Sequence, residues 1–156
     1  MKNFESAEAE FRKTLKIDPD NAGALNYLGY MLADRGIRLD EAHEMIKRAL
    51  VLEPQNGAYL DSMGWVYYRQ GKLNDAEEAL VRALDQMSQD PTVHDHLGDV
   101  YLKLGKTKEA IAQWQASLKE YERAAVPDRD PEQVAKVGKK LETARVKLAR
   151  ETGTQK

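Results

Sequence analysis

The chain has 156 residues, of which 42% are hydrophobic and 32% are charged, and its formal net charge is −2. This balance supplies enough apolar side chains for a folded protein, and the small net charge gives no overall attraction to nucleic acid or to an anionic membrane. The chain has no cysteine, which excludes disulfides and a thiol nucleophile, and no apolar run approaches the length of a membrane span.

Residues 1–21 have the pattern of one amphipathic helix. Phe4, Ala7 and Phe11 share a face at steps of three and four, and Asp18-Pro19 closes the segment. The first residues therefore indicate a charged helix rather than a secretory signal. The segment matches only the second half of the unit that follows, so we expect a partial repeat, and a chain that is a fragment of a longer array.

Residues 57–90 show that unit most clearly, as two amphipathic halves separated at Gly71. Glycine suits the left-handed position that ends a helix, so the first half is expected to stop there. Asn74 followed by Glu77 is a capping-box pattern, which predicts that Asn74 caps the restart of the second helix. The unit is thus a helical hairpin that cannot bury its apolar faces alone.

The unit recurs along the chain with a period of 34 residues. Gly98 lies 34 positions after Gly64, and Gly29 lies 35 positions before it, with one extra residue between Gly36 and Ala42. The linked positions are Leu28-Gly29…Ala42…Ala49…Pro54, Met63-Gly64-x-x-Tyr67…Ala76…Ala83 and Leu97-Gly98-x-x-Tyr101…Ala110…Ser117. This pattern resembles the tetratricopeptide repeat (TPR) family, in which small residues lie where helices approach most closely.

The resemblance implies an all-α fold, a right-handed superhelix of antiparallel hairpins. We expect an array over residues 1–121, made of the partial repeat 1–21 and the repeats 22–56, 57–90 and 91–121. In the last of these, Asp90-Pro91 predicts an N-cap with proline at the first helical position. A loop at 122–130 precedes a helix at 131–151 that starts in the same way and caps the array.

In this family the first helix of each repeat lines a concave groove that binds peptides or partner helices. The resemblance therefore implies a binding face made of Asn26, Tyr30, Asp34, Asp61, Trp65, Tyr68, Arg69, Asp95, Asp99 and Lys103. Trp65 directly follows Gly64, so it cannot share the core face of Met63, and an indole in a groove is a plausible anchor. The alternative is that Trp65 packs against the next repeat and only fills space.

The aspartates of this face predict a partner that is basic or both basic and apolar, unless the face is merely solvated. Residues 131–156 carry a net charge of +4, so the first 130 residues carry −6. The alternative function is therefore a structural module that self-assembles by docking its basic C-terminal helix into the acidic groove of another copy. A capping helix accounts for the same basic residues.

No constellation for catalysis, a metal or a cofactor stands out. His94 and His96 are two apart on an expected helix and point to different sides, and no glycine-rich phosphate loop occurs. The sequence predicts a non-catalytic scaffold that binds a protein or peptide, with no nucleic-acid partner. The repeats resemble the C-terminal part of long bacterial TPR proteins, some of them outer-membrane lipoprotein adaptors. The compartment stays open, either cytoplasmic or associated with the periplasm and outer membrane.

Overall fold

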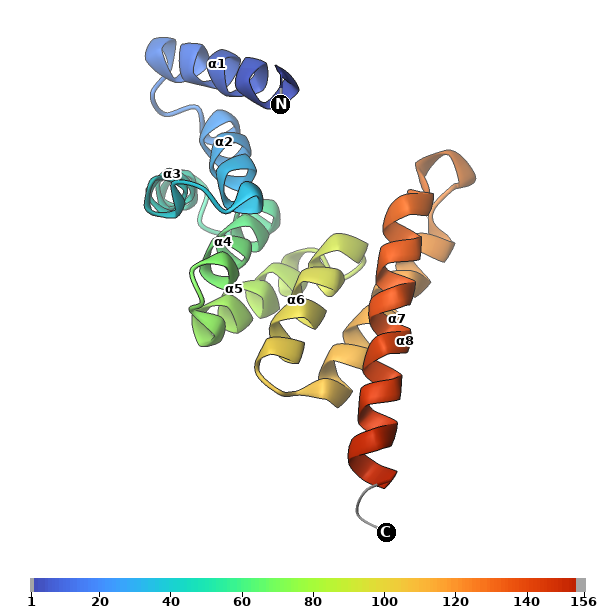
Figure 1. Ribbon diagram of the computed structural model, residues 1–156. Coiled ribbons are helices and arrows are strands. Elements are labelled where there is room, and N and C mark those ends of the chain that lie inside the picture. The colour runs from blue at the N-terminus through green and yellow to red at the C-terminus, as the bar shows by residue number, and fades with distance from the viewer. Residues whose placement is uncertain (1, 154–156) are drawn as a thin grey trace. The chain divides into compact units, whose positions relative to one another are not determined.

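The computed structural model describes residues 2–153, and every regular element in that range is a helix (Figure 1). The helices are α1 (Lys2–Ile17), α2 (Ala22–Arg35), α3 (Leu39–Leu52), α4 (Gly57–Arg69), α5 (Leu73–Gln86), α6 (Pro91–Lys103), α7 (Thr107–Arg123), the 3-10 turn η1 (Val126–Asp128) and α8 (Pro131–Gly153). They form two compact units, α1 to α5 and α6 to α8, and each is described by itself.

The helix boundaries follow from capping side chains and turn glycines. Asn21, Asn56 and Asp90 each accept a backbone N–H bond at the start of α2, α4 and α6, and Pro91 follows Asp90 as expected. Gly71 has a φ of +76°, so the predicted left-handed turn is confirmed. The prediction for Asn74 is wrong, because α5 already begins at Leu73, with the Ala76 N–H bonded to the Lys72 carbonyl.

Each hairpin closes where a helical glycine meets a large side chain of the next helix. A Cβ placed on Gly29 would lie 2.7 Å from Ile46 Cγ1, on Gly64 2.5 Å from Leu80 Cγ, and on Gly98 2.5 Å from Trp114 Nε1. The small residues at these positions are therefore required by close approach, as expected. The opposing side chains are fully buried and form the core of each hairpin.

In the first unit, α1 packs on α2 and is tied to α3 by ion pairs. Glu8 of α1 pairs with Arg38, and Arg12 pairs with Glu41. Arg38 has a φ of +46°, in the turn that holds the extra residue before Ala42. The inserted residue is thus accommodated by one left-handed position, which sends the Arg38 side chain toward α1.

In the second unit, α8 packs along α7 over a shared apolar cluster. Trp114 and Tyr121 of α7 lie against Val137, Leu141 and Ala144 of α8. Asp130 caps α8 by accepting the backbone N–H groups of the second and third following residues. The C-terminal helix therefore covers an apolar face of α7.

Candidate functional site

The predicted binding face of the first unit lies on α2 and α4. Its members, here called the α2–α4 face, are Asn26, Tyr30 and Asp34 of α2 with Asp61, Trp65, Tyr68 and Arg69 of α4. The indole N–H of Trp65 donates to Asp34 Oδ1 at 3.2 Å. This bond joins the C-terminal end of α2 to the middle of α4.

Trp65 is not the exposed anchor that the sequence predicted. Its side chain is only 8% exposed and belongs to a cluster with Leu32, Ala33 and Val66. One face of the ring stacks on Tyr68, with ring centroids 4.8 Å apart and planes 15° from parallel. The prediction is wrong because the contact between α2 and α4 uses the indole area for packing and its N–H for Asp34. The alternative reading, a structural tryptophan, fits the burial.

Other members of the α2–α4 face remain accessible. Asp34 and Arg69 are exposed, and Tyr30, Asp61 and Tyr68 are half-buried. The Arg69 guanidinium lies against Gly36, since a Cβ there would be 2.5 Å from Arg69 Nη2. That places a positive charge beside the C-terminus of α2, where unpaired carbonyls favour a cation. The surface left for a ligand therefore carries both signs of charge and two phenol rings.

Asn26 is the one member of this face whose polar atoms are not all accounted for. It is 8% exposed, and its Oδ1 accepts no hydrogen bond within residues 2–153. A buried acceptor left unpaired typically costs about 1–3 kcal/mol, so such atoms are rare in folded proteins. Asn26 is thus a buried residue with an unpaired acceptor on the predicted face rather than a freely displayed side chain.

The predicted face of α6 is occupied by the chain's own C-terminal helix. The Lys140 ammonium of α8 lies 2.8 Å from Asp95 Oδ1 and 2.9 Å from Asp99 Oδ1, and the Trp114 indole donates to Asp95 at 3.0 Å. Both carboxylates are largely buried, with side chains 14% and 15% exposed. The prediction that they line an open acidic groove is therefore wrong, and only Lys103 stays exposed there.

The protonation equilibria of this cluster reflect burial and close charges. Burial, followed by the charge of Asp95, raises the pKa of Asp99 above its ordinary value, although Lys140 opposes this. Burial alone would lower the pKa of Lys140, but Asp99 and Asp95 together raise it. The two carboxylates, one helical turn apart on α6, therefore repel each other, and the Lys140 charge offsets this repulsion.

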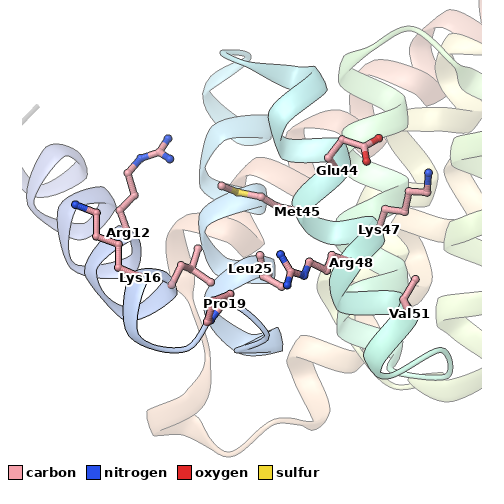
Figure 2. A pocket seen from close by; sticks show the side chains of 10 residues that line it. Arg12, Lys16, Pro19, Leu25, Glu44, Met45, Lys47, Arg48 and Val51 are labelled. Atoms are coloured by element: carbon pink, nitrogen blue, oxygen red, sulfur yellow. The ribbon is translucent and has the colours of Figure 1, made fainter.

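Sequence reasoning missed a groove between α1 and α3, here called the α1–α3 groove (Figure 2). It has a volume of about 710 Å³, and its walls carry Arg12 and Lys16 on α1 and Lys47 and Arg48 on α3. The four-residue spacing of Arg12 and Lys16 on one helix face was a readable signal. It was missed because the family resemblance directs attention to the first helix of each repeat, and α1 and α3 are second helices.

The described part of the chain lacks the features of two other classes of site. Within residues 2–153, no three side chains of the metal-binding types are arranged to hold a metal ion. In the same range, no helix has the length and apolar character needed to cross a bilayer.

Comparison with known families places repeats along most of the chain. A profile described as "Tetratricopeptide repeat" matches residues 1–57, one described as "TPR repeat" matches 64–105, and a second tetratricopeptide profile matches 91–122. A TPR repeat-containing protein of Pseudomonas aeruginosa is 56% identical over 66 residues, which is 42% of this chain. The matched segment spans only 11% of that relative's length.

Solved structures show the same fold at low sequence identity. The crystal structure of MamA is similar with a TM-score of 0.63 and 22% identity, over 96% of this chain and 91% of that one. PcrH, solved in complex with the chaperone binding region of PopD, has a TM-score of 0.71 and 18% identity, over 83% of this chain and 95% of that one. With the repeat profiles, the glycine contacts and the helical hairpins in agreement, the chain belongs to the tetratricopeptide repeat family.

Proposed function

We propose that this chain is a non-catalytic scaffold that binds a segment of another protein across the α2–α4 face. PcrH, a structural neighbour, is a protein solved with a binding region of its partner, which supports a protein ligand here. The exposed Asp34 and the half-buried Asp61 favour a basic side chain in that segment, and Tyr30 and Tyr68 offer aromatic contact area. Because Lys140 already pairs with Asp95 and Asp99, the acidic character of the proposed site comes from the first unit alone.

The observation that carries this proposal is the unpaired Oδ1 of Asn26. The oxygen is buried in the free chain, so a ligand N–H reaches it only when the Asn26 side chain turns outward. The bound state then pairs an acceptor that the free state leaves unpaired. The gain would be specific to binding, since the described chain provides no donor for this oxygen. Asn26 is therefore expected to matter for affinity and not for stability.

A peptide selection tests the proposal. Peptides enriched from a random phage-displayed library on the full chain are measured by fluorescence anisotropy against the original chain, Asn26→Leu and Asp34→Asn. Asparagine at 34 keeps an acceptor for the Trp65 indole and removes only the charge. We expect binding to weaken about tenfold in each variant, equivalent to ~1.4 kcal/mol, with Asn26→Leu at least as stable as the original chain.

The matched control is Arg82→Gln, an exposed residue of α5 outside the face. It should leave every selected peptide unaffected. Selected peptides that bind both face variants as tightly as the original chain would show that the ligand site lies elsewhere.

Self-assembly through the basic C-terminal helix is the competing function. The structure uses one of that helix's charges, Lys140, within the same chain, and with it two of the predicted acidic partners. Sedimentation of the full chain and of a chain ending at Asp130, both at low salt, separates the functions. A larger assembly for the full chain alone would favour self-assembly over a foreign partner.

A further inference from the structure

The α1–α3 groove has an apolar floor. It consists of Leu15 near the end of α1, Pro19 in the turn that follows, Leu25 of α2, and Met45 and Val51 of α3. Leu25 is buried and Leu15 and Met45 are half-buried, while Pro19 and Val51 are exposed. Val51 is 74% exposed although it is a large aliphatic residue. Clustered exposed apolar side chains on a folded protein mark interaction surfaces, and methionine adapts its shape to different ligands.

Further exposed apolar side chains lie at the ends of the two wall helices, outside the groove lining. Ile17, the last residue of α1, is 87% exposed, and Leu52, the last residue of α3, is 43% exposed. A partner that lay along the groove and reached past these helix ends would also remove this apolar surface from water, which favours binding.

Cations stand on both walls of the groove. Figure 2 shows Arg12 and Lys16 on α1 and Lys47 and Arg48 on α3, with Glu44 as the one acid among the lining side chains. Arg48 extends toward α1, whereas the ammonium groups of Lys16 and Lys47 point outward, away from the opposite wall. The lining therefore carries four positive charges and one negative charge. An anionic partner is favoured over a cationic one.

The four cations differ in how far the chain neutralises them. Arg12 pairs with Glu8 at 2.8 Å and with Glu41 at 2.9 Å, and Arg48 donates to Asp20 at 2.9 Å. Lys16 and Lys47 make no ion pair in the described part of the chain. The positive charges of the two arginines are thus used in ion pairs within the chain. Lys16 and Lys47 supply the positive charge that remains available to a ligand.

We propose that the α1–α3 groove binds an acidic amphipathic helix of another protein, a second interaction surface separate from the α2–α4 face. Both walls are helices whose backbone groups are already paired, so an extended segment would leave its own N–H and C=O groups unpaired over an apolar floor. A helix satisfies its backbone internally. On the α3 wall the lining runs from Glu44 to Val51, which is two helical turns and matches apolar residues at i, i+3, i+4 and i+7.

The apolar side of such a helix faces Pro19, Met45 and Val51, and its glutamates or aspartates flank the floor on both edges. Carboxylates on the two edges pair with Lys16 on one wall and Lys47 on the other. Apolar contact supplies affinity, and charge supplies orientation and the rate of association. Binding therefore weakens as salt increases, because these pairs are solvent-exposed.

The test uses a designed helical peptide of about 18 residues, long enough to be partly helical alone, with leucines at i, i+3, i+4 and i+7 between glutamates. Its counterpart carries lysine in place of every glutamate. Fluorescence anisotropy measures both against the full chain, the double variant Lys16→Glu/Lys47→Glu, and Val51→Ser. The matched control is Lys72→Glu/Lys108→Glu, two exposed lysines outside the groove.

We expect the acidic peptide to bind and the basic one not to bind. The double variant in the groove should weaken binding by about tenfold or more, Val51→Ser by a smaller factor, and the control pair not at all. All changed residues are exposed, so circular dichroism should show unchanged folding.

Three outcomes overturn the proposal. The first is no binding of the acidic peptide, and the second is equal loss in the groove variant and the control pair. The third is binding of the chain to vesicles of phosphatidylcholine and phosphatidylserine that depends on Lys16 and Lys47 while the peptide is ignored, since the groove then recognises an anionic membrane. Asp34→Asn should leave the acidic peptide unaffected, so failure here is distinct from failure of the α2–α4 face.

Discussion

The glycines at 98 and 138 lie inside helices of the same unit, yet alanine should act on them in opposite directions. At Gly98, a Cβ would sit 2.5 Å from Trp114 Nε1 and 2.8 Å from two further indole atoms. Trp114 is fully buried and hydrogen-bonded to Asp95, so the indole cannot move away without breaking that bond. At Gly138 nothing lies within 4 Å of the added carbon.

The magnitudes follow from two opposing effects. Alanine in a helix interior is favoured over glycine by about 0.5–1 kcal/mol, which applies at both sites. Forcing a methyl group into a packed core costs about 1–3 kcal/mol, which applies only at Gly98. Gly138→Ala should therefore stabilise the chain by about 0.5–1 kcal/mol, and Gly98→Ala should destabilise it by up to ~2 kcal/mol.

Urea denaturation followed by circular dichroism measures both free energies of unfolding. The difference between the two variants isolates the steric effect at the indole, because the helix preference cancels. A crystal structure or indole fluorescence of Gly98→Ala should also show Trp114 displaced. If the two variants shifted the urea midpoint by the same amount in the same direction, the close contact between α6 and α7 would not constrain the fold.

Lys140→Met should destabilise the chain by about 1–2 kcal/mol at pH 7, measured by thermal unfolding. The loss is smaller than for a fully buried ion pair because Lys140 is partly exposed. As the control, Lys139→Met changes an exposed lysine and should have little effect in the same assay. Without the Lys140 charge, the pKa of Asp99 in the folded state rises further, so the folded variant binds more protons as the pH falls. The loss of stability caused by Lys140→Met should therefore become smaller as the pH falls toward 4. A loss of stability that did not change with pH would refute the charge explanation. At Glu8 a hydrogen bond from Arg38 lowers the carboxyl pKa below 4.5, so its stabilisation of α1 is present above pH 4.5 and lost as the pH falls through the folded value. Glu8→Gln should therefore speed amide hydrogen exchange in α1 at neutral pH, and this difference should disappear under acid conditions.

The repeat framework could be predicted because its contacts are local and periodic. Gly64 meets Leu80 within one hairpin, and Gly98 meets Trp114 at the same spacing. Two helices that pack this closely need small residues at fixed offsets, so these contacts produce a periodic pattern that can be recognised in the sequence. The caps at Asp90 and Asp130 were predictable for the same reason, since a cap bonds to residues two or three positions away.

Asn74 shows where local reasoning fails. Its spacing to Glu77 fits a capping box, yet α5 starts one residue earlier, at Leu73. Leu73 is half-buried, and Lys72 donates its N–H to the carbonyl of Tyr67 in the preceding helix. The turn at Gly71 thus sets the start of α5, and the side chain of Asn74 has no part in it.

The sequence by itself determined the hairpins, their small-residue contacts and the side of each first helix that faces away from its own hairpin. Only the tertiary structure decided which side chains on that side stay available, because their partners come from distant segments. Lys140 reaches Asp95 across 45 positions, and Trp65 reaches Asp34 across 31. No periodic pattern encodes such pairs, since each depends on how two separately folded helices meet. The α1–α3 groove could not be predicted for the same reason. Neither α1 nor α3 has the pattern of a binding site by itself, and the groove forms only where the two helices lie side by side.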